Sequence, residues 1–325
     1  MTSDTTGDTT ADTGRDPGRG PGRDTGRSAF GAASTAGEVL AGIDLTGRTA
    51  VVTGGYSGVG LAATRALARA GARVVVPARR PETARQALAG VERAEVERLD
   101  LGDLDSVRAF AERFLRRRAT LDILIAAAGI MACPETRVGP GWEAQFAVNH
   151  LGHYALTHLV WPALAAAGAA RVVSVSSGYG ADWRIRWDDP QFTRGYDKWA
   201  AYAQSKLANI LFARHLDRLG GPYGVHAFSV DPGWIRTPLQ RHLTAGEMVA
   251  AGWIDAEGNA APGLFRTPEQ GAATPVWAAT SRELDGHGGA YCADCRVTGE
   301  GPADDGEAAR LWALSAGLTG LDRIR

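Results

Sequence analysis

The fold is decided by the stretch Thr49-Ala50-Val51-Val52-Thr53-Gly54-Gly55-Tyr56-Ser57-Gly58-Val59-Gly60. A short apolar run leads into a glycine-rich turn, and a helical pattern over 61–70 follows. A strand that runs through T-G-x-x-x-G-x-G into a helix is typical of dinucleotide binding, because the glycines allow a tight turn and the helix N-terminus offers free N–H groups to a pyrophosphate. Glycine-rich turns also occur for purely structural reasons, so the motif needs support from its surroundings.

That support comes from the residues that follow. Short apolar runs at 73–76, 94–101, 121–128, 170–176, 225–230 and 290–293 predict strands, and helical patterns at 81–91, 104–117, 142–167, from Tyr202 and from Thr267 alternate with them. Such alternation indicates right-handed crossovers and a parallel sheet. We expect an α/β fold, with a single doubly wound Rossmann domain and a seven-stranded parallel sheet over residues 39–325.

The amino-acid composition argues against several other classes of protein. Of 325 residues, 45% are hydrophobic and 22% charged, and the formal net charge of -1 gives no reason to expect a nucleic-acid or anionic-membrane partner. Residues 1–38 are almost entirely polar or small and predict a disordered tail. No signal-peptide core or membrane-spanning run is seen, and three cysteines suit a reducing compartment, so we expect a cytoplasmic protein.

The end of the second predicted strand indicates which dinucleotide is bound. An acid there would bond the adenosine ribose, whereas an arginine would attract a 2′-phosphate. This chain has Arg79 and Arg80, and the first acid is Glu82. We therefore expect NADP(H) to be preferred over NAD(H), unless the two arginines belong only to a solvated loop. Equal or better turnover with NADH would contradict the expectation.

Tyr202 and Lys206 lie four residues apart at the start of a predicted helix, so the two side chains share one face. A nearby cation favours a phenolate and lowers the pKa of a tyrosine, which then serves as a general acid or base. For the pair alone, a chance spacing on a surface helix is the simpler interpretation. The other motifs of the chain change that balance.

Together these motifs resemble the short-chain dehydrogenase/reductase family over residues 43–296, and within it the retinol dehydrogenase and WW-domain oxidoreductase branch. Further matches are Asp100-Leu101, Ala128-Gly129, Asn149 in Val148 to Tyr154, Ser176-Ser177, Asp231-Pro232-Gly233 and Thr237. The resemblance implies a catalytic tetrad of Asn149, Ser177, Tyr202 and Lys206. It also implies a cofactor site made by Gly54, Tyr56, Ser57, Gly58, Val59, Gly60, Arg79, Arg80, Asp100, Leu101, Ala128, Gly129, Tyr202, Lys206, Pro232, Gly233 and Thr237.

The implied roles are chemically consistent. Ser177 would hold the substrate oxygen, Tyr202 would give it a proton as hydride reaches the carbon, and Lys206 would lower the pKa of the tyrosine and bind the ribose. Asn149 would anchor a water that relays protons. The resemblance further implies that residues 237–266 cover the substrate. It also implies that the helices through Asn149 and Tyr202 form a homodimer or homotetramer. The tryptophans at 183, 187, 199, 234 and 253 suit a bulky hydrophobic carbonyl or alcohol, unless they serve only core or edge packing.

Two departures and several alternatives accompany this resemblance. Ala126-Ala127-Ala128-Gly129 replaces the usual Asn-Asn-Ala-Gly, so we expect a loss of stability, and Tyr56 replaces an asparagine. A non-catalytic dinucleotide-binding regulator would need the glycine loop but not the tetrad, and a carbon–carbon double-bond reductase uses the same fold. The histidines at 150, 153 and 158 and the cysteines at 292 and 295 favour packing over metal binding, so no metal site is expected.

Overall fold

The computed structural model describes residues 28–178, 180, 183–298, 304–322 and 324. Its centre is an eight-stranded sheet in the order β10-β9-β8-β7-β4-β1-β2-β3. The strands are β1 (Thr49–Thr53), β2 (Arg73–Ala78), β3 (Ala94–Arg98), β4 (Ile123–Ala126), β7 (Ala170–Val175), β8 (Val225–Asp231), β9 (Tyr291–Ala293) and β10 (Arg296–Val297). The first seven of these are parallel, as expected, and the two-residue β10 adds an antiparallel edge to β9.

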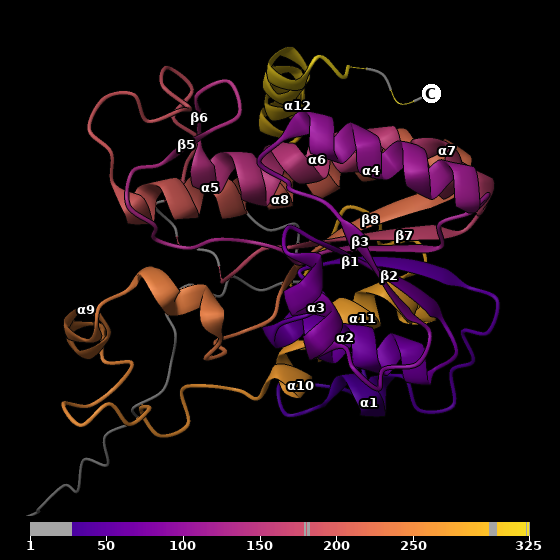
Figure 1. Cartoon of the computed structure of the whole chain (residues 1–325), viewed down its shortest axis with the longest axis horizontal. Coiled ribbons are helices and arrows are strands. Elements are labelled where there is room, and N and C mark those ends of the chain that lie inside the picture. The colour runs from indigo at the N-terminus through magenta and orange to yellow at the C-terminus, as the bar shows by residue number, and fades with distance from the viewer. Residues whose placement is uncertain (1–27, 179, 181–182, 299–303, 323, 325) are drawn as a thin grey trace, which may run out of the picture.

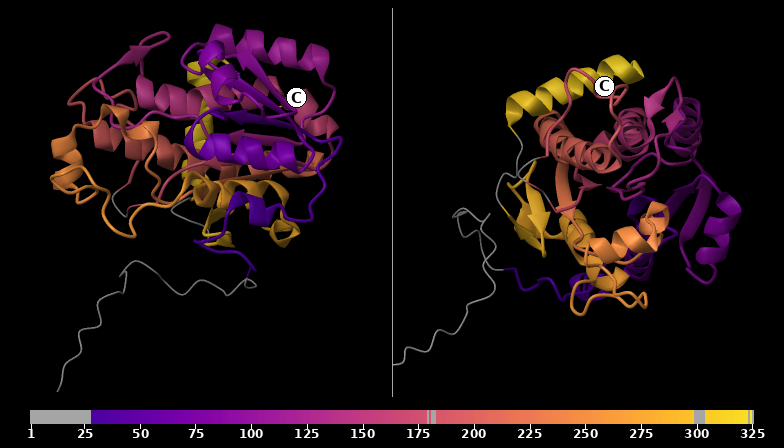
Figure 2. Two further views of the ribbon diagram at one scale, coloured as in Figure 1. Left: turned by 60° about the horizontal axis from the view of Figure 1, so that its bottom comes forward. Right: turned by 90° about the vertical axis from the view of Figure 1, so that its left-hand side faces the viewer.

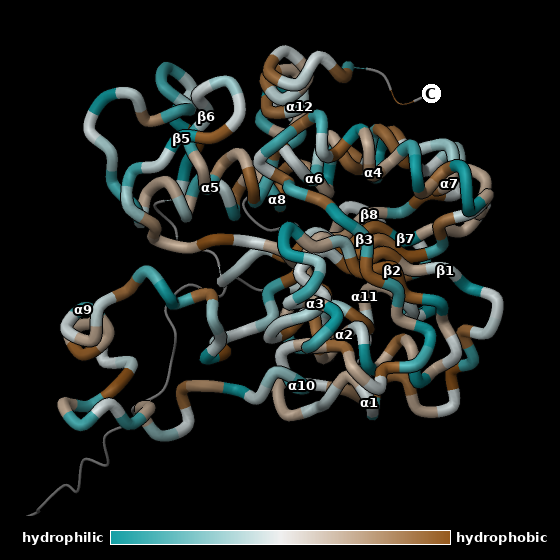
Figure 3. The backbone as a smooth tube through the Cα atoms, in the orientation of Figure 1, coloured by the Kyte–Doolittle hydropathy of each residue, from teal (hydrophilic) through white to brown (hydrophobic). Residues whose placement is uncertain are grey.

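Two layers of helices cover the sheet (Figure 1). On one face lie α1 (Ala36–Val39), α2 (Gly58–Arg69), α3 (Pro81–Ala87), α10 (Pro268–Gly271) and α11 (Ala273–Thr280). On the other lie α4 (Leu104–Arg117), α6 (Gly152–Leu159), α7 (Trp161–Ala166), α8 (Lys198–Gly220) and α12 (Asp305–Thr319). Because both faces are covered, the central strands are continuously apolar, which Figure 3 shows as brown at the middle of the sheet.

Strand β2 is two residues longer at its C-terminal end than the sequence predicts. We expected Pro77 to end it, since proline cannot donate a ladder hydrogen bond. Instead Pro77 and Ala78 pair with β3, whereas the pairing with β1 stops at Val75. The missing N–H of Pro77 therefore removes no hydrogen bond between β1 and β2. The strand continues to Ala78, and Arg79 is the first residue after it.

The predicted tail of residues 1–38 extends too far. Residues 1–27 lie outside the described residues, but Ala36 to Val39 form α1, which Thr35 and Glu38 start with a reciprocal capping box. Ala36 and Val39 are buried in the cluster that also contains Trp277 of α11. The folded domain thus begins before residue 38, because these few apolar side chains find a partner that is distant in the sequence.

The single helix expected over 142–167 is divided. The chain forms a hairpin of β5 (Arg137–Val138) with β6 (Trp142–Glu143), then α5 (Ala144–Phe146), a π-helical turn η1 (Ala147–Leu151), α6 and α7. Glu143 starts α5 by accepting the backbone N–H groups of Gln145 and Phe146. The wide turn η1 contains Asn149, and such turns occur often at functional sites.

Helix α12 packs across α8, and Figure 2 shows it on the outer side of that layer. Its Trp312 is buried with ring centroids 4.9 Å from Tyr154 and 6.0 Å from Phe212. The chain's own C-terminal helix therefore covers the helices that were expected to form a subunit contact.

Candidate active site

One large pocket opens at the carboxyl ends of the parallel strands. It has a volume of about 1250 Å³, and the ends of β1, β2, β4, β7 and β8 all border it. In doubly wound sheets this edge, where the crossovers change direction between β1 and β4, is the place at which ligands bind. All residues predicted to bind the cofactor line this pocket, as do Ser177, Tyr202 and Lys206.

The glycine loop is shaped so that backbone, not side chains, faces the pocket. A Cβ on Gly60 would lie 2.4 Å from the carbonyl oxygen of Gly54, and one on Gly58 would lie 2.9 Å from Cγ2 of Thr237. Gly54 and Gly58 also have positive φ angles of 67° and 51°, which favour glycine. Ser57 precedes α2 without a capping hydrogen bond from its side chain, so the first N–H groups of the helix are available to a pyrophosphate. This cradle fits a dinucleotide.

Arg79 and Arg80 follow β2 at the adenosine end of the cradle and are exposed in the pocket wall. Glu82, the first acid after them, bonds to Arg85 instead. The positions that would meet the ribose are therefore cationic. Opposite them, Asp100 accepts the N–H of Gly102 at 3.0 Å, which keeps this carboxylate in its own turn.

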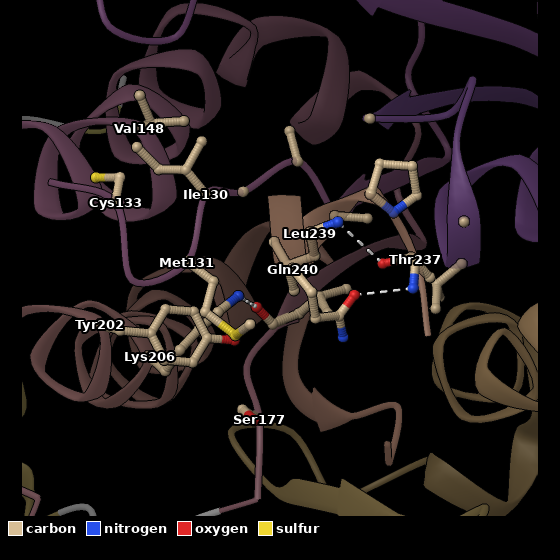
Figure 4. A pocket seen from close by; sticks show the side chains of 18 of the residues that line it. Ile130, Met131, Cys133, Val148, Ser177, Tyr202, Lys206, Thr237, Leu239 and Gln240 are labelled. Atoms are coloured by element: carbon tan, nitrogen blue, oxygen red, sulfur yellow. Dashed lines mark hydrogen bonds between the residues drawn. The ribbon is translucent and has the colours of Figure 1, made fainter. Parts of the chain in front are cut away.

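Tyr202, Ser177 and Lys206 meet at the other end of the pocket (Figure 4). Lys206 donates to the carbonyl oxygen of Val175 at 3.0 Å, and its Nζ lies 5.7 Å from the Tyr202 ring centroid. The hydroxyl of Ser176 donates at 2.8 Å to the carbonyl oxygen of Lys206. Because Ser176 is committed to the helix backbone, Ser177 is the serine that is available to a substrate oxygen.

The expected lowering of the tyrosine pKa is not found. Burial raises the pKa of the Tyr202 phenol, the hydrogen bond with Ser177 opposes this, and the negative charge of Asp231 adds to it. Burial also lowers the pKa of Lys206 to about 8, against the opposing effect of Asp231. The reason is that both groups are almost completely removed from water. The phenol is thus protonated near neutral pH.

Asn149 is buried behind the pocket and does not line it. Its side chain accepts the N–H of Ile130 at 2.9 Å and donates to the carbonyl of Ile130 and to Oγ of Ser205, both at 2.9 Å. Ser205 in turn donates to the carbonyl oxygen of Tyr202 at 2.7 Å. Asn149 therefore ties the loop after β4 to the helix turn that carries the tyrosine.

A second set of hydrogen bonds holds the loop after β4, in which alanines replace the usual asparagines. Thr53, at the end of β1, accepts the N–H of Ala128 at 3.0 Å, and its Oγ1 lies 2.8 Å from Nε2 of His153. Nδ1 of His153 lies 2.9 Å from the carbonyl oxygen of Asn149. Since burial lowers the pKa of His153 to about 4, the ring is neutral and donates through one nitrogen only. These contacts join the loop after β4 to β1 and η1.

The end of the pocket beside Tyr202 is apolar and is partly covered by residues 237–266. Leu239, Leu243 and Trp253 pack on the buried group of Met131, Ala132 and Tyr202. The ends of this segment meet where Ile235 bridges Arg266. Between them lie the short helix η3 (Pro238–His242) and α9 (Ala245–Ala250), which Lys198 of α8 holds through an ion pair with Glu247.

Three tryptophans gather at the mouth of this end. The Trp253 ring centroid lies 6.0 Å from that of Trp199 and 5.1 Å from that of Trp234, both in edge-on arrangements. Trp199 and Trp234 remain exposed at 38% and 50%. Trp187 does not line the pocket and lies beneath Arg310 of α12 instead.

Several pocket residues were missed from the sequence. Asp231 was read only as part of a motif, yet its charge acts on both Tyr202 and Lys206, and its Oδ1 accepts the N–H of Gly233 at 2.9 Å. Met131 comes from a loop, and Leu239 and Arg241 come from the five-residue helix η3, which is too short for periodicity to mark an inward side chain. The importance of Asp231 comes from its proximity to the helix of Tyr202 and Lys206. That proximity is a property of the fold, and the sequence alone does not show it.

Within the described ranges, no cluster of three or more His, Cys, Asp or Glu residues could hold a metal ion. Cys292 and Cys295 are buried and unpaired in the hairpin of β9 and β10. In the part of the chain that the structure describes, no helix combines the length and apolar character needed to cross a bilayer.

Comparisons with known proteins agree with this geometry. The family model described as short chain dehydrogenase matches residues 48–248. A probable oxidoreductase of Streptomyces lividans is 45% identical over 295 residues, which cover 84% of this chain and 98% of the relative. Retinol dehydrogenase 14 of Homo sapiens is 37% identical, with 85% of this chain and 87% of the relative covered.

Solved structures show the same fold. An uncharacterised protein from Mycobacterium paratuberculosis superposes with a TM-score of 0.69 at 33% identity, covering 91% of this chain and 99% of the other. A protein assigned as an NAD(P)-dependent gluconate 5-dehydrogenase from Beutenbergia cavernae, with NADP bound at low occupancy, superposes with a TM-score of 0.60 at 31% identity over 78% and 97% of the two chains. This chain therefore belongs to the short-chain dehydrogenase/reductase family, in its retinol dehydrogenase-like branch, and is an NAD(P)-dependent oxidoreductase.

Proposed function

We propose that this chain is a cytoplasmic, NADP(H)-dependent enzyme that interconverts a carbonyl and an alcohol on a hydrophobic small molecule. The observation that carries the proposal is the continuity of one pocket, from the Arg79 and Arg80 end, past the glycine loop, to Tyr202 and the apolar segment beyond it. A dinucleotide cradle and an apolar reaction chamber share that space. The cofactor, when bound, supplies or accepts the hydride.

The chain's own residues would orient the substrate and move one proton. Ser177 would donate a hydrogen bond to the substrate oxygen and hold it near the Tyr202 phenol. Since the phenol is protonated near neutral pH, Tyr202 begins reduction as the acid and gives its proton to the oxygen. Lys206, beside it, favours the resulting phenolate and would contact the ribose of the cofactor. In alcohol oxidation the same groups act in reverse.

Asn149 would act by position and by relay. Its side chain is fully engaged with Ile130 and Ser205, so its direct effect is to hold the turn of Tyr202. Its proposed relay role would place a water between Lys206 and solvent, and Gly129 leaves space there, because a Cβ would lie 3.1 Å from Oδ1 of Asn149 and 3.8 Å from Nζ of Lys206.

The substrate class follows from the lining of the chamber. Met131, Leu239 and the three tryptophans offer a large apolar surface with few polar groups, which suits bulky hydrophobic aldehydes, ketones or quinones. The relatives named retinol dehydrogenase agree with a hydrophobic substrate.

The proposal is tested by measuring kcat/KM with NADPH and NADH against a panel of such carbonyls. We expect NADPH to be preferred, and we expect Arg79→Met together with Arg80→Met to remove most of that preference while leaving turnover with NADH. A preference for NADH in the unmodified chain would refute the cofactor assignment. Reduction of a carbon–carbon double bond, or tight NADPH binding with no turnover of any compound, would refute the reaction.

A further inference from the structure

A third arginine, from the covering segment, lines the pocket that Arg79 and Arg80 border. Arg241 belongs to η3 and lines the same pocket as Arg79 and Arg80. Within the described part of the chain, none of these three arginines pairs with a carboxylate. Arg241 donates only to the backbone carbonyl of Pro238, at 3.0 Å. Three exposed cations that face one cavity without an anion repel one another, which indicates a site for a multiply charged anion.

The electrostatics of Arg241 locate it near the other two. Partial burial lowers the pKa of its guanidinium, and the positive charges of Arg79 and Arg80 lower it further, whereas the phenol of Tyr56 in the glycine loop has the opposite effect. Arg241 thus shares the pocket with Arg79, Arg80 and Tyr56 and lies within electrostatic range of all three.

The turn that carries Arg241 is held firmly against the cofactor cradle. Thr237 and Gln240 form a reciprocal capping box, in which the Thr237 N–H donates to Oε1 of Gln240 at 2.8 Å (Figure 4). Gln240 also donates to the carbonyl of Ile235 at 2.9 Å. On the same turn Leu239 packs against Met131 and Tyr202. One turn therefore carries both Arg241, which lines the pocket with Arg79 and Arg80, and Leu239, which packs beside Tyr202.

The geometry points to Arg241 as a third ligand of the 2′-phosphate of NADP(H), through which that phosphate secures η3 and places Leu239 over the reaction chamber. The inference rests on the proposed preference for NADP(H). It goes further because it gives the covering segment a role in choosing the cofactor. A dinucleotide that lacks the 2′-phosphate would leave Arg241 without its anion and the segment less restrained.

The test compares Arg241→Met with Arg236→Met, which changes an arginine directly before the same segment that does not line the pocket. Dissociation constants are measured for NADPH, NADH, adenosine 2′,5′-bisphosphate and ADP. In Arg241→Met, loss of one charge-assisted hydrogen bond should raise the dissociation constants of NADPH and the bisphosphate by roughly five- to tenfold. The dissociation constants of NADH and ADP should change by less than about twofold. Arg236→Met should bind all four as the unmodified chain does.

Amide hydrogen exchange over residues 237–250 tests the coupling. Adenosine 2′,5′-bisphosphate should slow exchange more than ADP does in the unmodified chain, and this difference should vanish in Arg241→Met. Equal weakening of NADPH and NADH would assign Arg241 to the pyrophosphate and overturn the inference, as would unchanged NADPH affinity. If the unmodified chain itself binds NADH as tightly as NADPH, the proposed cofactor preference fails instead, which separates the two outcomes.

Discussion

His150 should make the fold sensitive to mild acid. It lies in η1 with Nε2 2.7 Å from Oγ of Ser315 in α12, and its ring centroid is 5.2 Å from that of Phe146. Burial, with a smaller effect from His153, lowers its pKa from 6.5 to about 3. The ring is therefore neutral in the folded protein throughout the range in which an unfolded histidine takes up a proton.

The sign and size of the effect follow from proton linkage. Because the folded-state pKa is depressed, the unfolded chain binds more protons below its own pKa of 6.5, so the stabilisation is complete above that pH and is lost as the pH falls toward the folded-state value. At about pH 5.5, one unit below the unfolded-state pKa, the free energy of unfolding should fall by about 1.4 kcal/mol on account of His150. That figure changes little with the folded-state pKa, because the folded ring takes almost no proton there.

The assay is urea unfolding, followed by tryptophan fluorescence, at about pH 8 and about pH 5.5. The loss of stability between these two conditions should be smaller in His150→Gln than in the unmodified chain by about 1.4 kcal/mol. His287→Gln changes a partly exposed histidine before β9. This variant should lose as much unfolding free energy between the two pH values as the unmodified chain does. If His150→Gln and the unmodified chain lose the same free energy, the imidazole is not a buried neutral group, and the reasoning is refuted.

Three further predictions concern the packing and the pocket. Trp312→Ala should lower the free energy of unfolding by about 3–5 kcal/mol in urea titrations, because it empties an aromatic cluster; an unchanged free energy of unfolding would contradict this. Gly60→Ala should weaken NADPH binding by roughly tenfold or more, since its Cβ would meet the Gly54 carbonyl at 2.4 Å, and unchanged affinity would show that the loop is not the cradle. Trp253→Ala should raise the KM for bulky carbonyls by several-fold and spare small ones; an equal effect on both would argue against a substrate contact.

The sequence predicted well what depends on local pattern. The alternation of apolar runs and helices identified seven parallel strands, and the residues assigned to the cofactor all line one pocket. Both features arise from short segments whose meaning does not depend on distant neighbours.

The predictions from the sequence failed for features that depend on tertiary contacts. Helix α1 is too short to form alone and exists because it packs on α11, and α12 lies beyond the region that the family resemblance covers. The π-helical turn at Asn149 leaves no mark in an apolar pattern, so the divided helix was read as one. The pKa of Tyr202 was predicted from the charge of Lys206 alone, whereas burial, which needs the fold, is the largest effect on it and raises it. Arg241 became a candidate ligand only when the fold placed the turn of η3 at the pocket that Arg79 and Arg80 line.

The most direct test of the central claim is the rate of NADPH oxidation with hydrophobic aldehydes, ketones and quinones, measured for the unmodified chain and for Tyr202→Phe, with the products identified. Removing one hydroxyl leaves the buried ring in place, so NADPH should bind both proteins with similar affinity. If Tyr202 is the proton donor, the unmodified chain should form the alcohol, and turnover should fall by roughly 10²- to 10⁴-fold in the variant. Full activity of Tyr202→Phe, or no alcohol from the unmodified chain with any carbonyl, would contradict the assignment.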